Sequence, residues 1–278
     1  MREKALEIVF LVLALGFAVA GYGLYRPLKT AYYPIEPDPK GLRIVTWNIG
    51  GAGGKTIELP EDKFLSHIAG VLAELDADVV LLQEVAGSRQ AHRLSRLLGL
   101  HWDAKVARGG YRNLAVLWQR GYLQTRLLSA DSRGALLIIY RSSGKPPVLA
   151  INVHADPFSA KRRNILLGQT TDALLKEENA KVKILAGDLN LDIDLDKRRD
   201  LFTDDEYLDV ETYNYIVQHL SDATLNTGST AEPDRRLDYI FVESKYVNVT
   251  HSGPWKGKRV ANMDHDPVVA DLQFGFKH

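Results

Sequence analysis

The chain has 278 residues, with 35 Lys and Arg against 35 Asp and Glu, 45% hydrophobic residues and no cysteine. This length is enough for one large α/β or all-β domain or for two small ones, and the composition excludes wholesale disorder and a collagen-like structure. The lack of cysteine excludes disulfides, a thiolate nucleophile and Cys-ligated zinc or iron–sulfur sites. Balanced charge argues against nucleic-acid binding by bulk electrostatics alone.

Residues 8–25 form an uncharged and strongly apolar run near the N-terminus. A helix of this length covers roughly 27 Å, just enough for the hydrocarbon core of a bilayer. We therefore expect residues 1–29 to be a targeting segment, either a signal anchor or a signal peptide cleaved after Ala20, with a buried core helix as a third reading. Tyr22 and Tyr25 extend the run past that cleavage site and suit a membrane interface, which favours the anchor.

Residues 30–41 hold three prolines and no apolar periodicity, so they are expected to form a stiff tether to a domain over 42–278. The basic residues that flank the apolar run are nearly balanced and leave its orientation open. An N-terminal anchor before a large domain usually places that domain outside the cytoplasm. We expect a single-pass membrane protein with an extracytoplasmic domain, or a secreted protein if the signal is cleaved.

Beyond the tether, apolar alternation, continuous apolar runs and helical spacing follow one another. In chain order they predict a strand over 42–48, a helix over 61–75, a strand over 78–83, a helix over 88–98, strands over 114–118, 135–140 and 148–153, a helix over 164–176, and strands over 182–186, 237–242, 247–251 and 268–274. No internal repeat and no glycine-rich phosphate loop is present. Because strands outnumber helices, we expect a mixed α/β domain with much antiparallel sheet.

Several of the predicted strands end in polar residues of the kinds that hold cations and phosphates. These strand ends carry Asn48, Gln83 and Glu84, Asn152 and His154, Asp188 and Asn190, and the late segment Asp264 to Asp266. Singly, each has a plain structural explanation, such as a turn, a helix cap or a buried histidine. Converging, they would form a cleft of carboxylates, amides and two imidazoles, which suits Mg²⁺ or Mn²⁺ and the chemistry of phosphoesters.

The ordered motifs around these residues resemble those of the endonuclease/exonuclease/phosphatase superfamily. They are TWNIG (46–50), LLQEV (81–85), NVHADP (152–157), GDLN (187–190), RRLDYIF (235–241) and MDHDPV (263–268). That superfamily includes DNase I-like nucleases, abasic-site endonucleases, bacterial sphingomyelinases and inositol polyphosphate 5-phosphatases. The resemblance covers residues 42–274 and implies a DNase I-like α/β (α+β) fold, a four-layer α/β/β/α sandwich of two mainly antiparallel sheets.

The resemblance also implies a divalent cation, Mg²⁺ or Mn²⁺, and names its ligands. Glu84 would be the principal metal carboxylate, and Asp264 a second carboxylate on the metal side. Asn48 would help to position the metal or the phosphate. A cation held there would neutralise the non-bridging oxygens of a phosphoester.

Five further residues take catalytic roles by the same resemblance. Asp188 would activate or orient the attacking water, with Asn190 holding the phosphate or Asp188. His154 would contact the scissile phosphate. His265 would stabilise the transition state or act as an acid or base, and Asp238 would hydrogen-bond to it and favour its protonated form. The identity of the general base stays open, and no covalent intermediate is implied.

One part of the chain departs from the family pattern. Many members have a Gly-Asn-Ala type of segment where residues 110–115 read GYRNLA, so that Arg112 stands where a small residue is common. Arg112 is either a contact to the substrate phosphate or an arginine on the surface of an edge strand. Trp118 and Arg120 replace a more usual Ser-Arg pair, which weakens inference about that side of the cleft.

Three basic clusters lie close to the motifs, at 161–163, 235–236 and 256–259. They are either solvated surface or a binding surface for a polyanion or a lipid phosphate, through residues such as Arg162 and Arg236. The first hypothesis for the function is a phosphodiesterase of the nuclease type, which would use these clusters to bind nucleic acid.

The alternative is a phospholipase C-like or sphingomyelinase-like enzyme, held beside its phospholipid substrate by the N-terminal membrane helix. Such an enzyme would use an exposed aromatic to enter the bilayer, for which Trp255 is a candidate. A non-catalytic binding module is a third reading, disfavoured because every expected catalytic position is filled. No protein partner is predicted.

Overall fold

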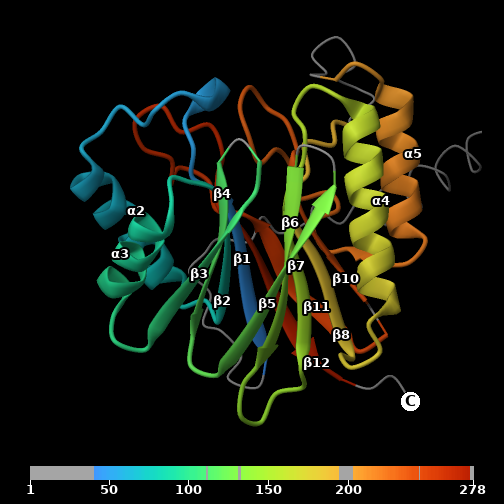
Figure 1. Ribbon diagram of the computed structural model, residues 1–278, viewed down its shortest axis with the longest axis horizontal. Coiled ribbons are helices and arrows are strands. Elements are labelled where there is room, and N and C mark those ends of the chain that lie inside the picture. Colours follow the sequence, from blue (N-terminus) through green and yellow to red (C-terminus); the bar gives the residue numbers. More distant parts are fainter. Residues whose placement is uncertain (1–40, 111, 131–132, 194–202, 244, 276–278) are drawn as a thin grey trace, which may run out of the picture. The chain divides into compact units, whose positions relative to one another are not determined.

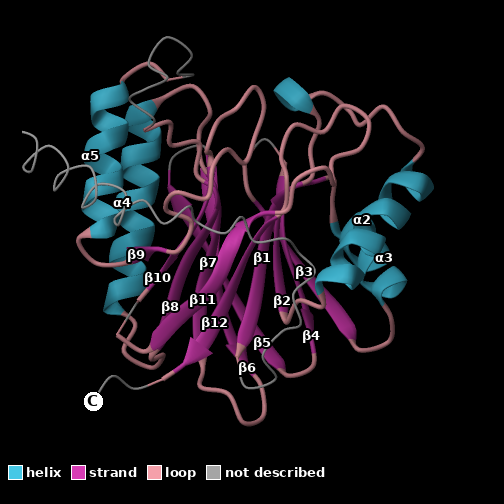
Figure 2. Cartoon of the chain, turned by 180° about the vertical axis from the view of Figure 1, so that it is seen from behind, coloured by secondary structure: helices cyan, strands magenta, loops and turns pink. Residues whose placement is uncertain are grey.

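The computed structural model describes residues 41–110, 112–130, 133–193, 203–243 and 245–275. In this part of the chain two six-stranded sheets lie face to face, and helices cover their outer faces (Figures 1 and 2). The expected four-layer α/β/β/α sandwich is confirmed. The predicted targeting segment over 1–29 and nearly all of the tether lie outside the described residues. Among the residues that the structure does describe, no helix is long and apolar enough to cross a membrane.

Each sheet contains one parallel pair of strands, and its other pairs are antiparallel. The first sheet has the spatial order β11 (Val247–Pro254), β12 (Val268–Phe274), β1 (Leu42–Asn48), β2 (Val79–Val85), β4 (Asn113–Gln119) and β3 (Trp102–Arg108). The second has the order β5 (Tyr122–Ala130), β6 (Arg133–Arg141), β7 (Val148–His154), β8 (Val182–Asp188), β10 (Asp238–Val242) and β9 (Ser221–Asp222). The parallel pairs are β1 with β2 and β7 with β8.

Helices connect the strands of both parallel pairs, because two parallel strands need a crossover. Helix α2 (Glu61–Leu75) connects β1 to β2, and α4 (Ala160–Lys176) connects β7 to β8. Parallel strands end at the same edge of a sheet, so each β-α-β unit brings two strand ends together. In the register Asn48 lies opposite Gln83, and His154 lies opposite Asp188.

Three apolar cores hold the layers together. Side chains alternate along β1, so that Val45 and Trp47 pack against α2 and α3 (Ser88–Leu98), while Ile44 packs between the sheets with Ile184. The third core joins β7, β8 and β10 to α4 and α5 (Glu206–Val217). Strand β1 is buried on both faces, and the one charged residue within it, Arg43, is paired with Asp271 (2.6 Å).

Four elements were not predicted, namely β3, β5, β9 and α5. Strands β3 and β5 lie at sheet edges, where half-exposed positions admit polar residues and blur the alternation. Helix α5 lies in an acidic and aromatic stretch with weak amphipathic periodicity, and the carboxylate of Asp205 caps it by accepting from the amide of Leu208 (3.0 Å). A 3-10 turn, η1 (Ala52–Gly54), follows β1.

Candidate active site

The polar ends of strands from both sheets meet in one cleft of about 580 Å³. The amide Nδ2 of Asn48, at the end of β1, donates to Oδ2 of Asp188, at the end of β8 (2.9 Å). This hydrogen bond joins the two sheets at the edge where β7 also ends (Figure 1). Of the predicted catalytic and metal-binding residues, all but Asp238 line the cleft, namely Asn48, Glu84, His154, Asp188, Asn190, Asp264 and His265.

Asp188 is the centre of this cluster. Its Oδ1 accepts from the backbone amide of Asn190 (3.1 Å), which fixes the carboxylate plane. Its Oδ2 lies 3.5 Å from Nε2 of His154 and 3.7 Å from Nε2 of His265. One buried carboxylate oxygen therefore faces both imidazoles.

Gly187 explains why Asp188 can come so close to β7. Its φ is 143°, a backbone conformation that side chains rarely adopt. A Cβ at this position would lie 2.0 Å from the backbone oxygen of Val153 on the neighbouring strand. The glycine of the Gly-Asp motif is therefore required by the close pairing that sets His154 beside Asp188.

Glu84 is held in a strained backbone conformation. Its φ is 57°, in the left-handed region, where the pairing of β2 with β4 shifts register between Leu82 and Val85. The side chain packs against Gly50, where a Cβ would lie 2.1 Å from Oε2 of Glu84. Oε1 accepts from Nδ2 of Asn48 (3.3 Å), whereas the buried Oε2 accepts no hydrogen bond from the described part of the chain.

The donor set suits a hard divalent cation. Oε2 of Glu84 is buried and accepts no hydrogen bond from the described residues, although Nε of Arg112 lies 3.5 Å away. Burial raises the pKa of both Glu84 and Asp264, against the opposing effect of the nearby cationic side chains of Arg112 and His265.

A second group, Asp188, Asp238 and His265, brings ligand atoms within 4.8 Å of one another. In that group Nδ1 of His265 is already hydrogen-bonded to Oδ2 of Asp238 (2.8 Å), and Oδ1 of Asp238, like Oε2 of Glu84, has no hydrogen-bond partner among the described residues. Of the two carboxylates, Glu84 is the one that lines the cleft.

His265 and Asp238 form a buried pair behind the cleft. Nδ1 of His265 donates to Oδ2 of Asp238 (2.8 Å), the contact that the family resemblance implied. Burial alone would favour the neutral ring, but the carboxylates of Asp238 and Asp188 outweigh it and raise the pKa of His265 to about 10. Thr230 holds Asp238 in place through a hydrogen bond from its hydroxyl to Oδ2 (2.7 Å). At neutral pH His265 is therefore an imidazolium.

His154 has the opposite charge state. Burial lowers the pKa of its imidazole to about 4, so that it is neutral at pH 7. A guanidinium nitrogen of Arg133 lies 3.4 Å from Nδ1 of His154. Because a guanidinium only donates, Nδ1 acts as the acceptor and the proton of His154 lies on Nε2, which faces Asp188.

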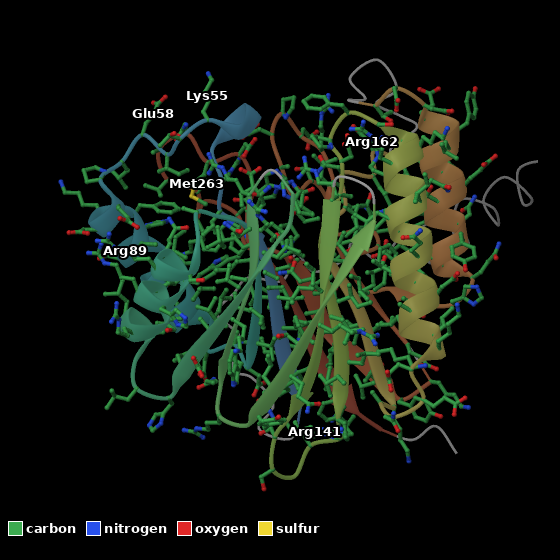
Figure 3. The ribbon with its side chains drawn as sticks, viewed as in Figure 1. Lys55, Glu58, Arg89, Arg141, Arg162 and Met263 are labelled. Atoms are coloured by element: carbon green, nitrogen blue, oxygen red, sulfur yellow. The ribbon has the colours of Figure 1, made fainter. Side chains whose placement is uncertain are left out.

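The three arginines expected to bind substrate do not line the cleft. Arg112 lies behind Glu84, with its Nε 3.5 Å from Oε2, and it donates to the backbone oxygen of Gly54 (3.1 Å). Arg162, beside the start of α4 in Figure 3, pairs with Asp156 at 3.3 Å and is about half exposed. Both arginines thus support site loops.

Arg236 points to another part of the surface. It pairs with Asp222 (2.7 Å) and lies over the ring of Tyr239, 4.4 Å from the ring centroid.

The basic clusters are paired with carboxylates. Arg163 is completely buried against Asp209 (2.7 Å). Lys258 pairs with Glu74 (3.1 Å), and Lys256 pairs with Asp266 (3.3 Å). These charges are largely neutralised within the chain.

Sequence reasoning missed the apolar and cationic rim of the cleft. Phe158 and Arg133 line it, although neither belongs to a motif that had been assigned a role. A hint for Phe158 lies in its place directly after the NVHADP motif, whereas β6, which Arg133 begins, carries no such signal. Trp255, expected as an exposed aromatic, is instead buried in the first core, with Lys258 over its ring. It is covered by protein and is not a membrane contact.

Comparison with known proteins agrees with this geometry. The model of the Endonuclease/Exonuclease/phosphatase family matches residues 45–257. An endonuclease/exonuclease/phosphatase from Beutenbergia cavernae is similar in structure, with 23% identity, a TM-score of 0.65 and coverage of 84% of this chain and 72% of that one. The human Nocturnin catalytic domain with a bound sulfate anion is also similar in structure, with 16% identity, a TM-score of 0.59 and coverage of 86% of this chain and 97% of that one.

A third similar structure is D. rerio TDP2 in complex with a single-strand DNA product, with 16% identity, a TM-score of 0.63 and coverage of 84% of this chain and 98% of that one. At these identities the likeness shows a shared fold. No curated protein matches the chain. The family match spans most of the chain, and this chain belongs to the endonuclease/exonuclease/phosphatase family.

Proposed function

We propose that the protein is a divalent-cation-dependent phosphoester hydrolase, in the first place a phosphodiesterase of the nuclease type. The observation that carries this proposal is Asp188, whose Oδ2 faces a protonated and a neutral histidine at 3.7 and 3.5 Å. Phosphodiester hydrolysis needs an oriented water, a positive charge at the phosphoryl oxygens and help for the leaving oxygen. This cluster offers the first two, and a bound divalent cation would help the leaving oxygen.

Each residue takes a role that its surroundings support. Asp188 orients the attacking water and accepts a proton from it, while Asn190 keeps the carboxylate in position. His265, held protonated by Asp238, stabilises the charge that develops on the phosphoryl group. His154 donates a hydrogen bond to a phosphoryl oxygen through Nε2. Asp238 acts through His265 and is a positioning residue.

A cation completes the proposed machinery. Glu84, with Asn48 and Asp264, would hold Mg²⁺ or Mn²⁺, because these side chains offer oxygen ligands and Oε2 of Glu84 accepts no hydrogen bond from described residues. When bound, such an ion supplies positive charge that neutralises the phosphoryl oxygens.

A lipid phosphodiesterase is the second candidate, favoured by the apolar run over 8–25. We propose that residues 1–29 anchor the protein in a membrane with the domain outside the cytoplasm. If the substrate is a phospholipid, that anchor would hold the cleft beside its headgroups.

Hydrolysis by the full chain tests the proposal, with a single-stranded oligonucleotide and sphingomyelin vesicles as substrates, in Mg²⁺ or Mn²⁺ and in EDTA. Asp188→Asn and His265→Gln are each expected to lower kcat by about 10²- to 10⁴-fold, the range for groups that transfer or stabilise a proton. Asp103→Asn, at an exposed position of β3, is the matched control. Near-full activity of either site variant, with its circular dichroism unchanged, would refute the assignment.

A further inference from the structure

We propose that the edge of the domain opposite the cleft lies on a membrane surface, so that the cleft opens into the aqueous phase. The contact is a membrane-facing patch of exposed apolar and basic side chains, namely Arg96, Leu97, Leu100, Arg120, Tyr122 and Arg141. The inference rests on the membrane anchor and the phosphoester hydrolysis proposed above, and it narrows the substrate to a water-soluble phosphoester.

One loop and two strand ends bring the patch together. The loop between α3 and β3 carries Leu100. The turn between β4 and β5 lies beside this loop, because the backbone amide of Arg120 donates to the carbonyl oxygen of His101 (3.2 Å). Tyr122 begins β5 and lies opposite Arg141 in the register of β5 with β6. The patch is therefore one continuous part of the surface.

The apolar members of the patch are unusually exposed. Leu100 is completely exposed (102%), and Leu97 and Tyr122 are 49% and 58% exposed. Large apolar side chains that gather on a surface indicate an interaction site. Leucine favours the acyl boundary of a bilayer and tyrosine its headgroup region, so these three side chains suit shallow insertion into a membrane interface.

The charge of the patch favours a bilayer that contains anionic lipids. Its arginines are exposed and form no ion pair within 4.0 Å with any residue that the structure describes, namely Arg96, Arg120 and Arg141. Arg93 on α3 is different, because it pairs with Asp62. Near this edge Asp76 and Asp103 are exposed, and two carboxylates against three arginines leave a positive charge. A second copy of the chain is disfavoured, because a two-fold dimer would set these arginines against one another.

The chain enters the domain at this same edge. Strand β1 begins at Leu42, directly after the tether. The backbone amide of Asp78 donates to the carbonyl oxygen of Arg43 (2.9 Å), and the amide of Gln119 donates to the carbonyl oxygen of Asp78 (3.2 Å). The residue after Gln119 belongs to the patch. The proposed anchor is therefore joined to the domain on the side that carries the patch.

The cleft lies at the other end of the same strands. Strand β1 runs from Leu42 to Asn48, which lines the cleft, and its length is about 20 Å. Figure 3 shows Arg141 at the lower end of the molecule, and Lys55 and Glu58 at the upper end. A bilayer against the patch leaves the cleft facing water. Headgroups of that bilayer are then out of reach of the catalytic groups, whereas a soluble phosphoester enters freely.

A single spin label tests which edge faces the bilayer, because the chain has no cysteine of its own. The full chain is reconstituted in vesicles of phosphatidylcholine and phosphatidylglycerol. Ser143→Cys carries the nitroxide in the exposed turn after Arg141, and Glu58→Cys carries it at the opposite edge. Electron paramagnetic resonance then measures access of oxygen, which concentrates in the bilayer, and of a water-soluble nickel chelate. The label at position 143 is expected to be shielded from nickel, and the label at position 58 exposed to it.

An apolar variant and its control test the inserted side chain. Leu100→Glu should lower the ratio of docked to undocked domain, read from the label at position 143, about 10- to 100-fold, the range for one leucine returned to water. Leu225→Glu is the matched control, because this leucine is 52% exposed beyond β9, at the opposite edge of the second sheet from β5. Equal effects of the two substitutions would overturn the patch.

A charge variant tests the preference for anionic lipids. Replacing the three patch arginines together by glutamine should lower the same ratio about 100-fold, about fivefold for each lost charge. Omission of phosphatidylglycerol should have a similar effect, and added salt should weaken docking. Arg89→Gln, at the exposed start of α3, is the control. Docking that is the same with and without anionic lipid would contradict the charge argument.

Three outcomes of the labelling would overturn the inference. Equal nickel access at positions 143 and 58 would show that the domain does not dock. Shielding at position 58 in place of 143 would turn the cleft toward the lipid. Shielding at position 143 that arises in detergent without lipid, and rises with protein concentration, would assign the patch to a second copy.

Turnover separates this inference from the proposed function. The labelling needs no catalysis, so a chain that hydrolyses no phosphoester still gives a docking result. If alkaline carbonate releases the chain from the vesicles, the proposed anchor fails, and the same labels decide whether the patch binds lipid alone. In Mg²⁺ the docked protein should cleave an added oligonucleotide and leave sphingomyelin in the same vesicles intact. Cleavage of that sphingomyelin by docked protein would overturn the orientation.

Discussion

Replacing Thr230 by valine tests how much a buried, hydrogen-bonded hydroxyl contributes to the stability of the fold, in comparison with a buried hydroxyl that has no hydrogen-bond partner. The hydroxyl of Thr230 is completely buried, donates to Oδ2 of Asp238 (2.7 Å) and accepts from the backbone amides of Leu237 (3.1 Å) and Asp238 (3.0 Å). Valine has nearly the same shape but leaves three buried polar groups with one partner fewer. At about 1 kcal/mol or more for each such group, we expect the free energy of unfolding to fall by roughly 3 kcal/mol or more.

The control is Thr171→Val in α4. The hydroxyl of Thr171 is also completely buried but has no hydrogen-bond partner in the described structure. Its removal should leave stability unchanged or raise it by up to about 1 kcal/mol. Urea unfolding, followed by circular dichroism at 25 °C, measures both variants.

Equal unfolding midpoints for the two valine variants, with equal m-values, would refute the reasoning. Thr230→Val should also lower kcat about tenfold or more. The reason is that Asp238 loses the hydrogen bond that orients its carboxylate toward His265. Thr230→Ser should restore activity.

The remaining predictions concern the cation, a glycine and pH. Mg²⁺ or Mn²⁺ should raise the Tm of the wild type and not of Glu84→Gln; an equal rise in both would place the cation elsewhere. Gly187→Ala should lower Tm sharply or prevent folding, because the new Cβ would meet the backbone of Val153. Gly168→Ala, in open space on α4, should instead raise the free energy of unfolding by about 0.5–1 kcal/mol. Similar effects of the two substitutions would contradict the steric explanation. In EDTA, stability should fall as the pH drops from 6.5 to about 4, because the unfolded chain binds a proton that folded His154 does not. His154→Gln should flatten this slope by up to about 1.4 kcal/mol per pH unit, and an unchanged slope would rule out His154 as its source.

The elements that sequence patterns predicted well are the ones whose environment is uniform. Strands β1, β7 and β8 are buried almost throughout, so most of their residues are apolar and the polar residues at their C-terminal ends stand out. Edge strands such as β3 have mixed environments and gave no pattern.

The site was predictable in its residues and not in its geometry. Asp188 and His154 follow from motifs at strand ends, whereas the left-handed backbone of Glu84 depends on a bulge that only strand pairing creates. Charge clusters misled for a similar reason. Arg163 and Asp209 are 46 residues apart, and nothing local indicates that they form a buried pair.

The two β-α-β units divide the site between them. The unit β1-α2-β2 supplies Asn48 and Glu84, and the unit β7-α4-β8 supplies His154 and Asp188. The alignment of these halves is set by the apolar layer between the sheets, where Ile44 meets its neighbours at a distance from the cleft. Methyl groups in that layer therefore help to set how the two halves of the cleft face each other, and substitutions there are expected to change the proposed activity without altering any residue that lines the cleft.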